Sequence, residues 1–236
     1  KEDTPDEGDG HGHGVRENSS AILAELYNNV SLKQHMSNRI QENVRDFQAH
    51  LQLGIVLFKD ENFIEAKESL EFAYNLLPGY TGYPSPALVL SQIYEQEGDK
   101  ESQLQWLEVL LENLQHDFGS AMILAQAALD ESDFERANYY LDRALQVDPY
   151  RNDVHELKAQ FAKETGNNAL AVTEYEVLMS LEVNDPVEAQ TNLAEAYLSN
   201  GQLSEAKQSI LRALEIAPSF QRAQQILLQT IGEGSD

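Results

Sequence analysis

Apolar residues recur every three or four positions along this chain, from about residue 19 to residue 231. Side chains with that spacing fall on one face of an α-helix, whereas a half-buried strand would alternate apolar and polar residues. Glycine and proline stand mainly between the periodic blocks, where helices should end. Strand-type alternation is missing throughout, so the pattern predicts an all-α chain.

The first 18 residues differ from the rest of the chain. They hold six acidic residues, two basic residues and four glycines, with almost no apolar side chain. Such a segment cannot bury enough surface to offset its ordering entropy, so residues 1–18 are predicted to be a disordered acidic linker or tail. His11 and His13 lie in it, but two imidazoles are too few to define a metal site, and no metal or cofactor is expected.

Two N-terminal capping helices are predicted over residues 19–46. Ile22, Leu26 and Val30 share one helical face, and a second face begins at Leu32. Ser31 followed by Gln34 fits a capping box, which would start the second helix.

The segment from residue 47 to residue 220 repeats itself. Small residues recur at intervals of 37, 34, 34 and 35 positions: Gly54, Ser91, Ala125, Ala159 and Ala194. Twelve positions after each stands an alanine in four of five cases, and a large apolar residue follows four positions later. This register predicts one pair of antiparallel helices per unit, in which the small residues let the backbones approach closely. Ser85-Pro86 and Asp185-Pro186 fit the starts of two of these helices.

The period and the residue classes resemble those of the tetratricopeptide repeat (TPR) family, whose 34-residue unit is a helix-turn-helix. On this resemblance we place five repeats at 47–80, 84–117, 118–151, 152–185 and 187–220, and a C-terminal capping helix and tail over 221–236. The implied fold is an α-solenoid, a right-handed superhelix with flanking capping helices. The final helix should be more polar on its outer face.

The resemblance also implies that a peptide or partner segment binds in the concave groove lined by the first helix of each repeat. Carried over position by position, the partner-binding residues are Leu51, Ile55, Phe58, Leu88, Gln92, Met122, Gln126, Leu129, Glu156, Gln160 and Glu195. The N-terminal half of this set is apolar and the C-terminal half is acidic. This gradient favours a ligand with apolar anchors at one end and Lys or Arg at the other. Alternatively, the acids only reflect the overall charge, and residues 19–45 cover the apolar half.

Gln92, Gln126 and Gln160 occupy the same slot in three consecutive repeats. Primary amides carry donors and an acceptor, so a ladder of them would pair with the backbone of an extended ligand. The alternative is that glutamine, a good helix former, simply lies on a solvated face.

Composition narrows the classes of partner. Acidic residues outnumber basic ones 40 to 16, which gives a formal charge of −24. That field repels phosphate backbones and anionic headgroups, so nucleic acid and bare membrane are poor partners. No apolar run approaches the roughly 18 residues of a membrane helix, so direct membrane insertion is not expected. Cysteine is absent, and no P-loop, nucleophile elbow or zinc-protease motif occurs.

We therefore expect a non-enzymatic protein–protein interaction scaffold that binds a peptide or partner segment, without catalytic residues. Residues 1–18 look like an interdomain linker, which supports a second hypothesis: a C-terminal accessory domain of a larger enzyme or of a transport or biogenesis protein, positioning substrate or subunits. Self-association through the terminal helices is a third.

Overall fold

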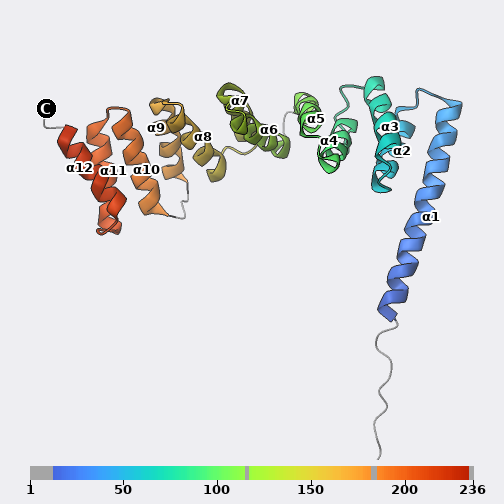
Figure 1. The fold of residues 1–236 in the computed structure, drawn as a ribbon, viewed down its shortest axis with the longest axis horizontal. Helices are drawn as coiled ribbons and strands as arrows, with labels where there is room; N and C mark the ends of the chain where they lie inside the picture. Colours follow the sequence, from blue (N-terminus) through green and yellow to red (C-terminus); the bar gives the residue numbers. More distant parts are fainter. Residues whose placement is uncertain (1–12, 115–116, 182–184, 234–236) are drawn as a thin grey trace, which may run out of the picture. The chain divides into compact units, whose positions relative to one another are not determined.

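A computed structural model describes residues 13–114, 117–181 and 185–233, with side chains from residue 28 to residue 232. These residues form helices and no strand (Figure 1). The helices are α1 (His13–Glu42), α2 (Phe47–Lys59), α3 (Phe63–Leu76), α4 (Pro86–Glu97), α5 (Lys100–Asn113), α6 (Phe118–Asp130), α7 (Phe134–Val147), α8 (Asn152–Glu164), α9 (Asn168–Ser180), α10 (Pro186–Ser199), α11 (Leu203–Ile216) and α12 (Gln221–Glu233). No helix in the described part of the chain is long and apolar enough to cross a membrane.

The chain divides into two compact units. Unit 1 (residues 1–114) contains α1–α5 and unit 2 (residues 115–236) contains α6–α12. Within them the helices pack as consecutive hairpins, α2 with α3, α4 with α5, α6 with α7, α8 with α9, and α10 with α11. The predicted all-α fold of helix-turn-helix repeats is confirmed.

Local sequence explains where most of these helices begin. A side-chain oxygen accepts a hydrogen bond from the backbone of the first turn at seven N-caps: Asp46, Ser85, Asp99, Asp117, Asp133, Asn167 and Asp185. Each such cap satisfies a backbone N–H that has no partner inside the helix. The two starts predicted at Ser85-Pro86 and Asp185-Pro186 are confirmed.

The turn inside each repeat places one residue in the left-handed region. Gly98, Gly166 and Gly201 adopt it with φ of 74°, 71° and 75°, and Glu61 and Ser132 adopt it with φ of 58° and 59°. All five occupy the same slot of their repeats. The turn geometry is therefore common to all repeats, although only three of them carry the residue that adopts it without strain.

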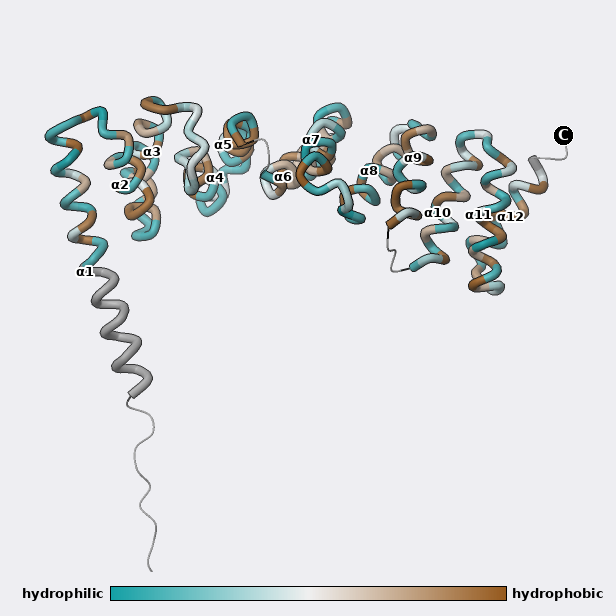
Figure 2. The backbone as a smooth tube through the Cα atoms, turned by 180° about the vertical axis from the view of Figure 1, so that it is seen from behind, coloured by the Kyte–Doolittle hydropathy of each residue, from teal (hydrophilic) through white to brown (hydrophobic). Residues whose placement is uncertain are grey.

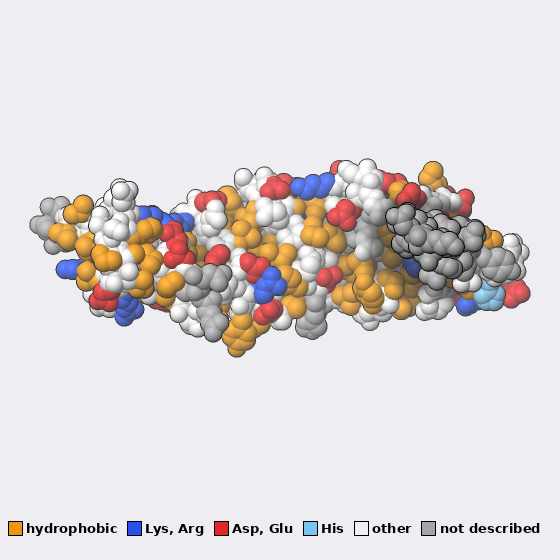
Figure 3. Space-filling model, turned by 90° about the horizontal axis from the view of Figure 1, so that it is seen from below, with side chains coloured by type: hydrophobic (Ala, Val, Ile, Leu, Met, Phe, Trp, Pro, Cys, Tyr) orange, Lys and Arg blue, Asp and Glu red, His pale blue; other side chains and the backbone are white. Residues whose placement is uncertain are grey.

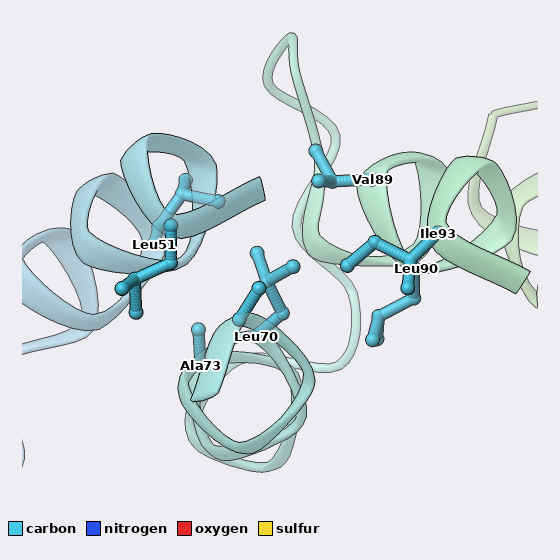
Figure 4. Packing of buried hydrophobic residues seen from close by; sticks show 8 residues of the cluster. Leu51, Leu70, Ala73, Val89, Leu90 and Ile93 are labelled. Carbon is cyan, nitrogen blue, oxygen red and sulfur yellow. The ribbon is translucent and has the colours of Figure 1, made fainter. Parts of the chain in front are cut away.

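The small residues of the repeat register lie in the core, as predicted. Ala125, Ala159 and Ala194 are fully buried. At Gly54 the helices approach closely, since a Cβ atom there would lie 2.5 Å from Leu70 Cγ. Around this crossing, side chains from α2, α3 and α4 meet in one apolar cluster (Figure 4). Hydrophobic and hydrophilic residues alternate along the coloured parts of the helices (Figure 2).

The N-terminal region differs from the prediction. Residues 1–12, with most of the predicted tail and His11, lie outside the described residues. One continuous helix, α1, runs from His13 through Ser31 to Glu42, so the predicted break and capping box at Ser31 are wrong. No glycine or proline interrupts this stretch after Gly14, and a serine inside a helix costs only a few tenths of a kcal/mol.

Helix α1 packs on α2. Met36 is buried, Lys33 Nζ lies 2.5 Å from Asp60 Oδ2, and Arg39 donates two hydrogen bonds of 3.0 Å to Asp46. Residues 28–42 therefore occupy the side of α2 that would otherwise be open at the start of the array.

The last helix, α12, packs on α10 and α11 through Ala223, Ile226 and Thr230. Its exposed positions include four glutamines, which fits the predicted polar face, together with Leu228, which is 71% exposed, and Ile231, which is 50% exposed.

Candidate functional site

In unit 1 the predicted partner-binding residues lie mostly within the packing. Leu51 is only 2% exposed and belongs to the core cluster with Leu70 and Val89 (Figure 4). Its side chain therefore does not reach the surface. Ile55 and Phe58 pack against the same cluster and are half-buried. Leu88 and Gln92 of α4 are half-buried as well.

Unit 2 holds a pocket of about 770 Å³ formed by the first helices of the fourth and fifth repeats, α8 and α10, with α9 contributing apolar surface. Its residues are Asn152, Asp153, Glu156, Gln160, Lys163 and Glu164 from α8, Tyr175 and Leu178 from α9, and Asp185, Glu188, Ala189 and Asn192 at α10. The structure thus places the predicted Glu156 and Gln160 together in one pocket.

The pocket is strongly acidic, with five carboxylates against one lysine. Arg151 pairs with Asp153 at 2.6 Å, and this hydrogen bond lowers the pKa of the Asp153 carboxyl. Glu156 and Glu164 have no ion-pair partner in the part of the chain that the structure describes. On the face of the molecule that Figure 3 shows, red acidic side chains are likewise scattered among orange hydrophobic ones. Two uncompensated carboxylates beside apolar surface suit a cationic ligand.

The predicted Glu195 lies beside this pocket at the centre of an ion network. Its Oε2 atom is 2.5 Å from Lys163 Nζ of α8 and 2.7 Å from Arg222 Nη2 of α12. Arg222 also binds Glu188 through Nη1. Burial works to raise the pKa of the Glu195 carboxyl, but the two cations outweigh it, so this pKa is lowered. The network joins α8, α10 and α12.

Two of the three glutamines of the predicted ladder lie in unit 2, exposed at equivalent positions of α6 and α8. Gln126 donates a hydrogen bond of 3.0 Å to Asp130, and Gln160 donates one of 3.4 Å to Glu164. Each amide is therefore oriented by the acid one turn later in its own helix. Met122 and Leu129, also predicted to bind a partner, are half-buried on α6.

A buried polar network joins the pocket's helices to α7. His155 Nδ1 lies 2.7 Å from Glu174 Oε2, and Lys158 Nζ lies 3.0 Å from Glu174 Oε1 and 2.6 Å from Asp142 Oδ1. Burial alone would lower the pKa of the Lys158 ammonium, but the hydrogen bonds to Asp142 and Glu174 outweigh it and raise this pKa. A buried charge needs such partners.

Sequence reasoning missed Arg222, Lys158 and Glu174. Arg222 follows Glu188 by 34 residues, which is one repeat length, so Arg222 occupies on α12 the position that Glu188 occupies on α10. That spacing is a signal that could have identified the pair. Lys158 and Glu174 carry only the weaker signal of a charge beside core positions. No group of three or more acidic, histidine or cysteine residues is arranged to hold a metal ion in the described residues.

Comparisons with known proteins agree with this architecture. Residues 187–220 match the family model described as tetratricopeptide repeat, which confirms the resemblance on which the repeats were placed. No curated protein matches the chain.

Several solved structures are similar in fold. YrrB, described as a TPR protein with an unusual peptide-binding site, is 15% identical, with 80% of this chain and 96% of that chain covered and a TM-score of 0.49. A thermophilic TPR protein of Thermus thermophilus, TTC0263, is 23% identical, with 78% and 98% covered and a TM-score of 0.39. The first TPR of Spaghetti (RPAP3), bound to an HSP90 peptide, is 19% identical, with 52% and 99% covered and a TM-score of 0.43.

Proposed function

We propose that this chain, an array of tetratricopeptide repeats, is a non-enzymatic interaction scaffold whose unit 2 binds a cationic segment of a partner protein between α8 and α10. The observation that carries this proposal is the pocket of about 770 Å³ with five carboxylates, one lysine and apolar surface from α9. Helix pairs that stack on their neighbours offer a preformed binding surface, which lowers the entropic cost of association.

The spacing of the carboxylates suggests what the segment looks like. Glu156 and Glu164 are eight residues apart on α8, a rise of about 12 Å. An extended chain covers that distance in about four residues. We therefore expect two Lys or Arg side chains about four residues apart, with an apolar side chain between them near Tyr175 and Leu178. The net charge of −24 would speed the encounter.

Other predicted groove residues would assist in this binding. Gln126 and Gln160 would hydrogen-bond the main chain of the segment, because an amide offers both a donor and an acceptor. Independently of this pocket, half-buried Ile55, Phe58 and Leu88 of unit 1 would supply apolar contacts to a partner.

The test uses the full chain and two labelled peptides, one with two lysines four residues apart and one with glutamates in their place. We expect the basic peptide to bind and its affinity to fall with salt. Glu156→Gln/Glu164→Gln should weaken it about tenfold, since two ion pairs at up to about 1 kcal/mol each are lost. Glu205→Gln/Glu215→Gln on α11, with the same charge change, is the matched control. Equal affinity for both peptides would refute the proposal.

A further inference from the structure

We infer that Arg222 occupies two carboxylates of α10, those of Glu188 and Glu195, and thereby limits the number of carboxylates that a cationic partner can bind at the pocket. The inference rests on the proposed function and deepens it: Arg222 selects for partners whose cations contact α8 rather than α10.

The arrangement starts from α10. Glu188 and Glu195 are seven residues apart, which is two helical turns, so both carboxylates lie on the same face. Arg222 of α12 spans them, with Nη1 on Glu188 and Nη2 on Glu195 at 2.7 Å. A guanidinium presents its donors in a fixed planar fork, so one side chain holds both carboxylates at once.

Lys163 of α8 is a second cation that binds Glu195. Its ammonium lies 2.5 Å from the same Oε2 atom of Glu195 that Arg222 contacts. Glu195 therefore has a cation from α8 and a cation from α12, and Glu188 has one from α12. On α8, by contrast, Glu156 and Glu164 have no cation partner among the described residues. Of these four glutamates, the two on α8 are thus open to a ligand cation, whereas the two on α10 are already paired.

A cationic segment would interact differently with the glutamates of α8 and with Glu188 of α10. Glu156 and Glu164 offer their carboxylates to a ligand cation with no cation of the described residues bound to them. Glu188 already accepts a hydrogen bond from Arg222, so a ligand cation at Glu188 also meets the positive charge of the guanidinium. The attraction of the ligand to Glu188 is then offset by its repulsion from Arg222. Removing the guanidinium should convert Glu188 from an occupied group into an available one.

The experiment measures binding of the two-lysine peptide to full-length variants by fluorescence anisotropy. Arg222→Gln keeps a helix-forming side chain and removes one positive charge. Arg212→Gln removes the same charge from the exposed face of α11 and is the matched control. We expect Arg222→Gln to bind about fivefold more tightly than Arg212→Gln, because Glu188 then attracts the ligand without a guanidinium beside it. Equal affinities for these two variants would overturn the inference.

A second pair of variants leaves Arg222 intact, in case its replacement unfolds α12. Glu188→Gln alone should change affinity less than twofold, because Glu188 is already occupied, whereas Glu156→Gln should weaken binding about threefold. In the Arg222→Gln background, Glu188→Gln should remove most of the gain. Equal losses from Glu188→Gln and Glu156→Gln in the natural chain would refute the inference while leaving the proposed function intact. Absence of binding in every variant would instead refute the proposed function, and the inference with it.

Discussion

The close contact between α2 and α3 makes Gly54 a sensitive test of the repeat register. Gly54 lies inside α2, where glycine is a poor helix former, so replacing it by alanine would normally stabilise the helix by about 1 kcal/mol. Here the added Cβ would lie 2.5 Å from Leu70 Cγ and 2.8 Å from Leu70 Cδ2. Carbon atoms in contact are about 3.5–4.0 Å apart, so the overlap is roughly 1 Å.

Leu70 has little room to relieve this overlap, because it is fully buried. Forcing one extra carbon into a packed core costs about 1–3 kcal/mol. Subtracting the gain in helix propensity leaves a net loss of about 1 kcal/mol for Gly54→Ala. The sign of the effect therefore opposes the one that helix propensity alone predicts.

Urea unfolding followed by tryptophan fluorescence measures this loss. Trp106 is the only tryptophan of the chain and packs edge-on against Tyr74 at 5.1 Å, so its emission reports on unit 1. With a denaturant slope of about 2 kcal/mol per molar urea, the midpoint of unfolding should fall by about 0.5 M.

A double-mutant cycle supplies the control. Leu70→Ala alone removes buried methyl groups and should cost about 3 kcal/mol. It should cost less in the Gly54→Ala background, because the new methyl group fills part of the vacated space. A higher unfolding midpoint for Gly54→Ala, or strictly additive effects, would refute the close-packing explanation.

Three further outcomes are expected. Glu61→Gly and Ser132→Gly should each stabilise their unit by about 0.5–1 kcal/mol in urea, because glycine adopts the left-handed conformation without strain; a loss of stability would contradict this. Lys158→Ala should destabilise unit 2 by about 3 kcal/mol in thermal melts, since it leaves the buried Glu174 carboxylate with less charge compensation, and an exposed lysine changed the same way should have little effect. Burial, followed by a hydrogen bond to a carboxylate, raises the pKa of Tyr197 to about 12. Stability linked to its protonated form should therefore be present below pH 10 and be lost as the pH rises towards 12. Tyr197→Phe should remove one tyrosinate from the high-pH end of the absorbance titration, and an unchanged titration would contradict the assignment.

The repeats and their core could be predicted because the residues that define them lie close together in the sequence and recur at a fixed spacing. The small residue and the large apolar residue appear in all five repeats and the alanine in four of them, so the register does not depend on one accidental match. Ser85 and Asp185 likewise act on backbone groups within their own first turn. Such features depend on few neighbours outside the helix pair.

The features that sequence reasoning missed depend on packing between elements. Ser31 carries a helix-start signal, yet the surrounding residues favour an uninterrupted helix. Leu51 occupies a slot that lines the groove in the family pattern, but α3 and α4 cover it here. The bridge from Arg222 to α10 forms only once α12 docks beside it, and long flexible side chains give no unique partner in a sequence.

Gly54 faces Leu70, Ala159 shares a cluster with Tyr175, and Ala194 shares one with Ile210. In these three hairpins a small residue on the first helix leaves room for a large residue on the second helix, and the residue pair differs from one hairpin to the next. A single helix transplanted between repeats would bring either a collision or a void with it. The part of this protein that can be exchanged is therefore the intact hairpin. Recombination or engineering that joins segments at hairpin boundaries should preserve folding, whereas joints inside a hairpin should disrupt it.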